Sequence, residues 1–290
     1  MAAARKVRIA CRNSEGAWVM KVVHRIGFRA SGEQRLALEA LGVKLPSAVS
    51  LPEGGEPLLT FDVDENHPNW SLLSALFDGW NVFNMVRTEF TKKELESARW
   101  LEVGAWHHGY PQPHDEEFGY LQATYDLTDW CESCGIGMKQ KAPFQMKREP
   151  KWGATRSCSS SGCTTSSLLL PMPGFAPSSP QAWGCRPVLN TKGVELKTVV
   201  QLVVETRVGI VTNGLAFERC ERCGRTKYLP VTRGAFPALR DVPTASLVRT
   251  AEYFGSGGQA DQRVLMSQDV ARALNAAGVR GAVLKPVTEL

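Results

Sequence analysis

The sequence Trp-Cys-Glu-Ser-Cys-Gly at residues 130–135 has a counterpart, Arg-Cys-Glu-Arg-Cys-Gly, at residues 219–224. Each Cys-x-x-Cys turn directs two thiol groups toward one point, and the glycine that follows lets the chain bend so that backbone N–H groups face the sulfurs. Together the two turns supply the four thiolates of a tetrahedral zinc site. The sequence therefore predicts one structural zinc ion per chain, bound by Cys131, Cys134, Cys220 and Cys223.

The two motifs lie far apart in the chain. Residues 135–219 separate them, whereas roughly 15–20 residues separate the motifs of a compact zinc ribbon. We therefore expect intervening structure, such as a hairpin in residues 196–212, to bring the motifs together. Two alternatives stay open: redox-active Cys-x-x-Cys pairs or cysteines buried as small hydrophobic residues. A catalytic zinc ion is not expected, because four cysteine ligands leave no position for water.

Composition identifies a globular protein, with 43% apolar and 22% charged residues. The first residues lack the apolar core of a secretion signal, and no run of 18 apolar residues occurs. We therefore expect a cytoplasmic protein with no membrane partner, in which paired cysteines bind metal rather than form disulfides. The remaining cysteines are not expected to be ligands; they are Cys11, Cys158, Cys163 and Cys185.

Charge is distributed unevenly along the chain. Residues 1–130 carry 13 Lys/Arg and 18 Asp/Glu, whereas residues 131–290 carry 21 and 11. Basic residues surround the second motif, namely Arg219, Arg222, Arg225 and Lys227. A zinc motif with interspersed arginines can bind nucleic acid, so a nucleic-acid-associated protein using this basic half is the second hypothesis for function.

Local patterns predict an α+β fold in two regions. Residues 1–125 form a mixed α/β region, with helices expected at 14–26, 33–41, 70–80 and 91–101 and strands at 7–11, 58–63 and 118–125. Residues 126–290 form a zinc-stapled, β-rich region, with strands expected at 196–205, 208–212 and 227–231 and a hairpin turn at Asn213-Gly214. This region ends in a strand–helix–strand unit at 264–266, 268–277 and 281–287, and Pro286 places the last strand at a sheet edge.

Residues 154–184 differ from the rest of the chain. They contain no Asp, Glu or Lys and many Ser and Pro. This composition favours a disordered loop, and the alternative is a stretch of altered reading frame produced by two compensating frameshifts. We place no function in this segment.

Two further stretches contain residue types that are common in active sites. The run from His107 to Glu117 has three histidines and three carboxylates, which could bind a metal or transfer protons. Its two prolines prevent a regular helix or strand, so the side chains have no fixed spacing. We therefore expect a solvated loop and name no catalytic residue. Gly255-Ser-Gly-Gly258 lacks the Lys-Ser/Thr of a phosphate-binding loop, and we expect a turn there. The chain is thus predicted to be non-enzymatic.

The paired motifs and the C-terminal run resemble the double-CXXCG proteins of myxobacteria. From Cys-Glu-Arg-Cys-Gly-Arg at 220–225 to Val-Leu-Lys-Pro at 283–286, the chain shows the motif, a linker, a strand, a helix ending in Gly-Val and a final strand with proline. The resemblance covers residues 220–287, and residues 131–135 by motif. That family is associated with immunity to swarming-inhibition toxins exchanged between sibling cells. The resemblance implies that this chain binds and neutralises a cognate toxin, and it carries over the four motif cysteines alone.

Overall fold

A computed structural model describes residues 20–50, 52, 54–105, 107–108, 119–150, 158–160, 168–171, 184–278 and 282–289. The protein is α+β, as the sequence predicts, and its chain divides into two compact units. The first unit comprises residues up to Glu94 together with Thr232–Gly234, and the second comprises Leu95–Val231 and Ala235–Leu290. The division therefore falls at Glu94, whereas the sequence places it near residue 125. The strand expected at 7–11 and most of residues 154–184 lie outside the described residues.

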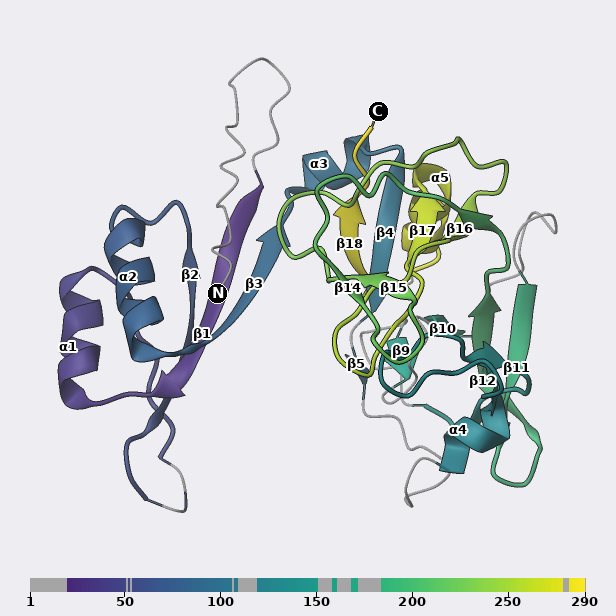
Figure 1. Ribbon diagram of the computed structural model, residues 1–290, viewed down its shortest axis with the longest axis horizontal. Helices are drawn as coiled ribbons and strands as arrows, with labels where there is room; N and C mark the ends of the chain where they lie inside the picture. The colour runs from purple at the N-terminus through teal and green to yellow at the C-terminus, as the bar shows by residue number, and fades with distance from the viewer. Residues whose placement is uncertain are drawn as a thin grey trace. The chain divides into compact units, whose positions relative to one another are not determined.

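The first unit is a three-stranded antiparallel sheet with two helices on one face (Figure 1). The strands are ordered β2-β1-β3, and their bounds are Leu58–Asp64 for β2, Lys21–Arg29 for β1 and Phe83–Glu89 for β3. The helices are α1 (Gly32–Ala40) and α2 (Trp70–Trp80). Their apolar faces pack on the sheet and form one core, which includes Ile26, Leu38, Leu59, Leu73 and Phe77.

The helix expected over residues 14–26 is wrong where the structure describes it, because residues 21–29 form the central strand β1. Ile26 pairs with Phe61 on one side and with Asn84 on the other. The spacing of Val22 and Ile26, four residues apart, fits a helical stripe, but it equally fits one face of a strand, since four is a multiple of two. Pairing with two distant strands decides between these periods, and a local pattern does not contain that information.

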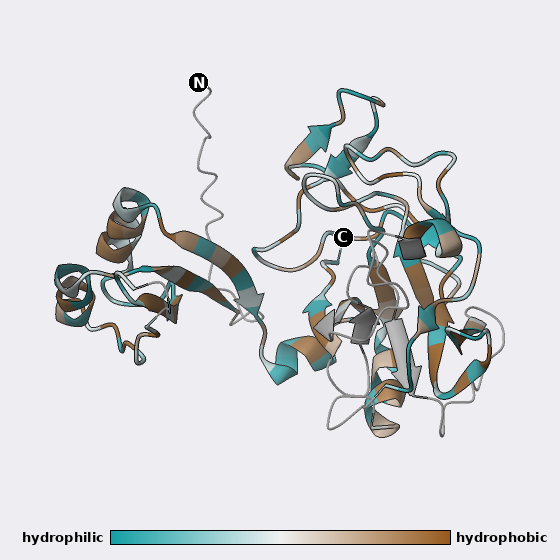
Figure 2. Ribbon diagram, turned by 90° about the horizontal axis from the view of Figure 1, so that it is seen from below, coloured by the Kyte–Doolittle hydropathy of each residue, from teal (hydrophilic) through white to brown (hydrophobic). Residues whose placement is uncertain are grey.

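In the part of the chain that the structure describes, the second unit contains four sheets. A five-stranded sheet has the order β13-β16-β17-β4-β18, and a six-stranded sheet has the order β5-β9-β10-β12-β11-β8. The first comprises β13 (Arg207–Val208), β16 (Leu247–Thr250), β17 (Val264–Ser267), β4 (Trp100–Ala105) and β18 (Ala282–Pro286). The second comprises β5 (His107–His108), β9 (Cys158–Ser160), β10 (Leu168–Pro171), β12 (Glu195–Val203), β11 (Gly184–Asn190) and β8 (Gln145–Met146). Strands of both units contain hydrophobic segments, which are brown in Figure 2.

Two short ribbons complete the second unit. One pairs β6 (Tyr125–Asp126) with β7 (Lys139–Gln140), and the other pairs β14 (Phe217–Arg219) with β15 (Thr226–Tyr228). Helices α4 (Gly119–Thr124) and α5 (Gln268–Ala276) also belong to this unit, and α3 (Lys92–Ser97) crosses the division between the units. Within the described residues, every helix is too short or too polar to cross a membrane.

Side chains bond to backbone N–H groups at the starts of three helices. Ser31 and Gln34 form a capping box at the start of α1, and the Thr91 and Glu94 side chains bond each other's backbone N–H before α3. The Ser267 side chain accepts from the Val270 N–H at the start of α5, and Pro286 lies in β18 at the sheet edge. These features depend on residues three apart in sequence or on the chemistry of one residue, so the sequence alone determines them.

Three predictions about strands and hairpins are wrong. Residues 119–124 form α4 instead of a strand, because Leu121, Thr124 and Tyr125 are buried together at helical spacing. A turn forms at 213–214, but it does not join a hairpin. The strand before it, β13, pairs in parallel with β16, and the strand after it, β14, pairs with β15. The hairpin expected in residues 196–212 is therefore absent, and β12 pairs instead with β10 and β11.

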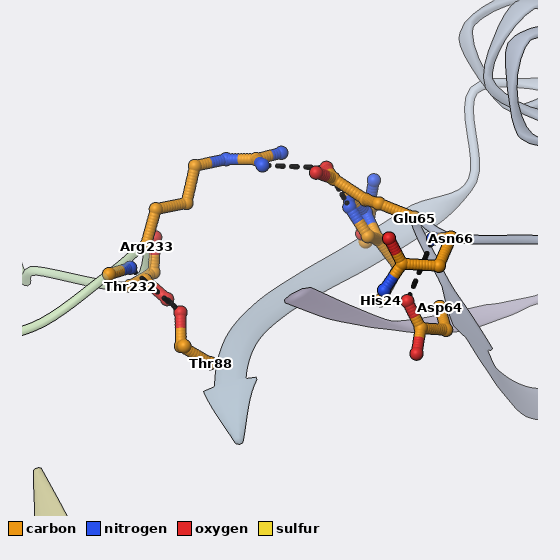
Figure 3. A network of polar contacts seen from close by, with 9 residues as sticks. His24, Asp64, Glu65, Asn66, Thr88, Thr232 and Arg233 are labelled. Carbon is orange, nitrogen blue, oxygen red and sulfur yellow. Dashed lines mark hydrogen bonds and ion pairs between the residues drawn. The ribbon is translucent and has the colours of Figure 1, made fainter. Parts of the chain in front are cut away.

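A polar network in the first unit centres on His24, which is buried (Figure 3). Its Nδ1 lies 2.9 Å from Asn84 Oδ1 and its Nε2 lies 2.8 Å from Glu65 Oε1. Arg233 donates to the same Glu65 oxygen at 2.6 Å. Burial would raise the pKa of Glu65, but hydrogen bonds and charge from His24 and Arg233 lower it. Beside this network, the Thr88 hydroxyl donates to the Thr232 carbonyl at 3.0 Å and accepts from the Gly234 N–H at 2.9 Å.

The lowered pKa of Glu65 predicts a pH-dependent contribution to stability. Folding lowers the pKa of this carboxyl group, so its ionised form stabilises the protein at pH values above its ordinary pKa of 4.5. This stabilisation is lost as the pH falls through the pKa of the folded state. We expect Glu65→Gln to lower the free energy of unfolding more at about pH 7 than at about pH 3. Urea titrations at both pH values measure this difference. Glu56→Gln, at an exposed position, serves as the control, and equal losses at both pH values for Glu65→Gln would contradict the prediction.

Candidate metal centre

Each Cys-x-x-Cys motif lies in the turn of one short ribbon. The first motif connects β6 to β7, and the second connects β14 to β15, the two strands that Figure 1 labels. Cys131 and Cys134 are buried, whereas Cys220 and Cys223 are half-buried. The distance between sulfurs is 3.7 Å for Cys131 and Cys220 and 3.6 Å for Cys134 and Cys223. All four sulfurs lie within 4.8 Å of one another, so the cysteines are positioned to hold a metal ion, as the sequence indicates.

The two motifs share one backbone geometry. The N–H of the first cysteine donates to a carbonyl five residues later, from Cys131 to Ile136 and from Cys220 to Arg225, at 2.9 Å in both cases. The glycine N–H donates back to the first cysteine carbonyl, at 2.7 Å for Gly135 and 2.8 Å for Gly224. Both glycines have a left-handed φ, 79° and 72°. This conformation costs glycine little, which explains why glycine follows each second cysteine.

Backbone N–H groups and neighbouring sulfurs shift the acidity of the buried thiols. Burial opposes ionisation of Cys131, but the Cys134 N–H and hydrogen bonds from the other three thiols lower its pKa to about 6. The pKa of Cys134 is raised to about 12, chiefly by burial and also by its sulfur neighbours, against the opposing effect of the Ile136 N–H. Of the two buried thiols, Cys131 therefore ionises more readily than Cys134, and a bound cation would favour the ionised form of Cys134.

A loop from the C-terminal part of the chain packs directly on the first motif. A side chain at Gly135 would place its Cβ 2.5 Å from the Gly258 carbonyl oxygen and 2.7 Å from the Ala260 nitrogen. Ala260 and the partly buried Tyr253 belong to the same small core as the four cysteines. The glycine-rich turn at 255–258 therefore supports the cysteine cluster. The sequence gives no indication of this contact, because the residues lie more than a hundred positions apart.

Three of the basic residues around the second motif bond to the backbone of the centre. Arg219 Nε donates to the Gly224 carbonyl at 3.1 Å, and Arg225 donates to the Ile136 carbonyl at 3.0 Å. Lys227 is buried, with 2% of its surface exposed, and it donates to the carbonyls of Cys134 in the first motif and of Gln259 in the C-terminal loop. Arg222 lies at the surface, 4.0 Å from Glu132. Residues that the sequence suggests as nucleic-acid contacts thus help to hold the two motifs together.

Other candidate residues remain outside this centre. The backbone of His107 and His108 forms β5, and residues 109–118 lie outside the described part of the chain. Cys185 is exposed and is not part of the cluster. Among the described residues, the four motif cysteines are the one group of Cys, His, Asp or Glu side chains arranged to hold a metal ion.

Searches against models of protein families, against curated proteins and against solved structures found no match to this chain. The resemblance to double-CXXCG proteins therefore stays a prediction from the motifs.

The packing of Gly135 predicts a difference between two otherwise equivalent glycines. Alanine at Gly135 or Gly224 must adopt a left-handed φ, which costs about 1 kcal/mol. At Gly224 the added Cβ meets nothing within 4 Å, whereas at Gly135 it collides with backbone atoms. We expect Gly135→Ala to lower the free energy of unfolding by about 1–3 kcal/mol more than Gly224→Ala. Urea titration of both variants measures the difference, and equal losses would show that the loop does not pack on the first motif.

Proposed function

We propose that the four cysteines hold one structural zinc ion. The distances of 3.7 and 3.6 Å between sulfurs support this proposal most directly. Ligands that lie about 2.3 Å from a tetrahedral metal are separated from one another by about 3.8 Å, so the measured spacing fits the edge of such a tetrahedron. Thiolate ligands favour zinc or iron over hard cations. Four of them complete the coordination shell and leave no place for a catalytic water, which assigns the metal a structural role.

The zinc ion would join segments 89 residues apart in sequence and fix the surface of the second unit. We propose that the protein uses this surface to bind another protein and that it is not an enzyme. Following the resemblance to double-CXXCG proteins, the partner would be a cognate toxin, neutralised in the cytoplasm. A few buried anchor side chains and complementary charge would supply the affinity.

The arrangement of charge near the second motif favours a protein partner over nucleic acid. A surface that binds nucleic acid presents free cations to the phosphates. Here Lys227 is buried, Arg219 and Arg225 bond to backbone carbonyls, and the exposed Arg222 lies near Glu132.

The zinc proposal predicts the metal content of purified protein. We expect about one zinc ion per chain in the wild type, measured by atomic emission, and loss of zinc with lower thermal stability in Cys131→Ser and Cys220→Ser. One variant from each motif tests whether both motifs serve the same ion. Cys185→Ser, an exposed cysteine outside the cluster, should keep its zinc. A reduced, folded wild-type protein without metal would overturn the proposal, and iron in place of zinc would correct the identity of the metal.

The partner proposal predicts protection from a toxin encoded beside this gene. We expect the product of the neighbouring open reading frame to arrest growth when expressed alone, and co-expression of this chain to restore growth. Cys131→Ser should restore growth poorly, because the surface fixed by the metal is lost. Failure of the wild-type chain to protect would contradict the immunity role. Binding to DNA or RNA that weakens steeply with salt would instead support the nucleic-acid hypothesis.

A further inference from the structure

We propose that Lys227 is a positioning residue of the metal centre, whose buried ammonium group offsets the negative charge of the metal–tetrathiolate cluster and holds the loop at 253–261 against it. This inference rests on the proposed metal site and assigns it a specific charge partner.

The surroundings of Lys227 are unusual for a lysine. The residue is 2% exposed, although it lies on β15 in a two-stranded ribbon. Its Nζ donates to the carbonyls of Cys134 and Gln259, each at 3.3 Å, and to the carbonyl of Gly257. These three acceptors match the three N–H bonds of an ammonium group. One side chain from the second motif's ribbon thereby connects the first motif to the loop.

Charge balance points from Lys227 to the sulfurs. A divalent metal with four thiolates has a net charge of about −2, and burying such a cluster is unfavourable unless cations lie nearby. Lys227, Cys134 and Cys220 line the same cavity. The carboxylate nearest to Lys227 belongs to Glu218, 3.6 Å away, and its side chain is about half exposed at 47%. Solvent weakens the attraction of that carboxylate, so Glu218 offsets only part of the charge of the ammonium group.

The same lysine connects the cluster to the five-stranded sheet. Gly257 and Gln259, which accept from Lys227, belong to the loop that ends at Asp261. The backbones of Phe254 and Asp261 bond each other in both directions at 2.8 Å and close the loop. The Asp261 side chain then pairs with Arg263 at 3.3 Å, and Arg263 Nε donates to Glu102 on β4 at 2.7 Å. A change in the charge of the cluster would therefore change how strongly Lys227 binds the carbonyl groups of this loop.

Zinc affinity, measured by competition with a chromophoric chelator at one fixed pH, tests the inference. We expect Lys227→Met to weaken zinc binding by about 10–100-fold, the usual effect of removing a residue that supports metal ligands. Lys285→Met is the matched control. Lys285 is a half-buried lysine of the second unit and donates to the Val231 carbonyl, but it is not among the residues that line the cavity beside Cys134 and Cys220. Loss of the ammonium group there should reduce stability and leave zinc affinity unchanged.

A second variant tests the charge argument without disturbing a buried residue. Glu218→Gln removes the half-exposed carboxylate beside Lys227 and keeps the ammonium group with its three carbonyl acceptors. If charge is what Lys227 supplies, this variant should bind zinc severalfold more tightly. Unchanged or weaker binding would contradict the charge role, even if Lys227→Met failed to fold.

The outcomes separate this inference from the zinc proposal. Wild-type protein without metal would overturn both. If the wild-type protein contains zinc, two results would overturn the role of Lys227 alone. One is a Lys227→Met variant that binds zinc as tightly as the wild type, and the other is a loss of affinity that Lys285→Met matches. Cobalt(II) substitution adds a spectroscopic measurement: sulfur-to-cobalt charge-transfer bands should report four thiolates in both wild type and Lys227→Met, because the variant retains every ligand. A band pattern with fewer thiolates in Lys227→Met would overturn the charge role, because it would show that a ligand is lost when the lysine is removed.

Discussion

The second unit depends on the meeting of four sulfur atoms from two distant turns. The turns have the same backbone geometry, but neither could bury its thiols alone, because each is only the end of a two-stranded ribbon. Contacts around the sulfurs make the meeting possible. Arg225 reaches across to the Ile136 carbonyl, Lys227 reaches to the Cys134 carbonyl, and the Gly258 region packs against Gly135. The cluster is thus enclosed by side chains and backbone from three separate parts of the chain.

Features that depend on neighbouring residues could be predicted from the sequence. The caps at Ser31, Thr91 and Ser267 and the edge position of Pro286 are of this kind. Features that depend on distant pairing could not. Val22 and Ile26 suit a helix or a strand equally, and only pairing with β2 and β3 selects the strand. The turn at 213–214 forms locally, but the strands around it pair with other partners.

The cysteine cluster likewise combines features that the sequence predicts with features that it does not. The motifs identify the four cysteines, because Cys-x-x-Cys-Gly contains the ligands and the bend together. The supporting residues carry no such signal. Lys227 resembles a surface cation in the sequence, and its burial follows from the loop at 253–261, which only the fold brings near. The run Gly255-Ser-Gly-Gly258 predicts only a turn, and the sequence does not indicate that the Gly258 carbonyl lies against Gly135.

The long connection between the two motifs has a consequence for how this protein can change over time. A metal bound by both motifs would close a loop of 89 residues. The entropy lost on closing a loop grows only with the logarithm of its length, so doubling the connection costs only about 0.6 kcal/mol. Insertions and deletions between the motifs therefore have little effect on the free energy of closing the loop. Insertion or deletion of one residue between the two cysteines of a motif, by contrast, would destroy the geometry of the ligands. We expect related chains to keep the spacing within each motif and to vary widely in the distance between them.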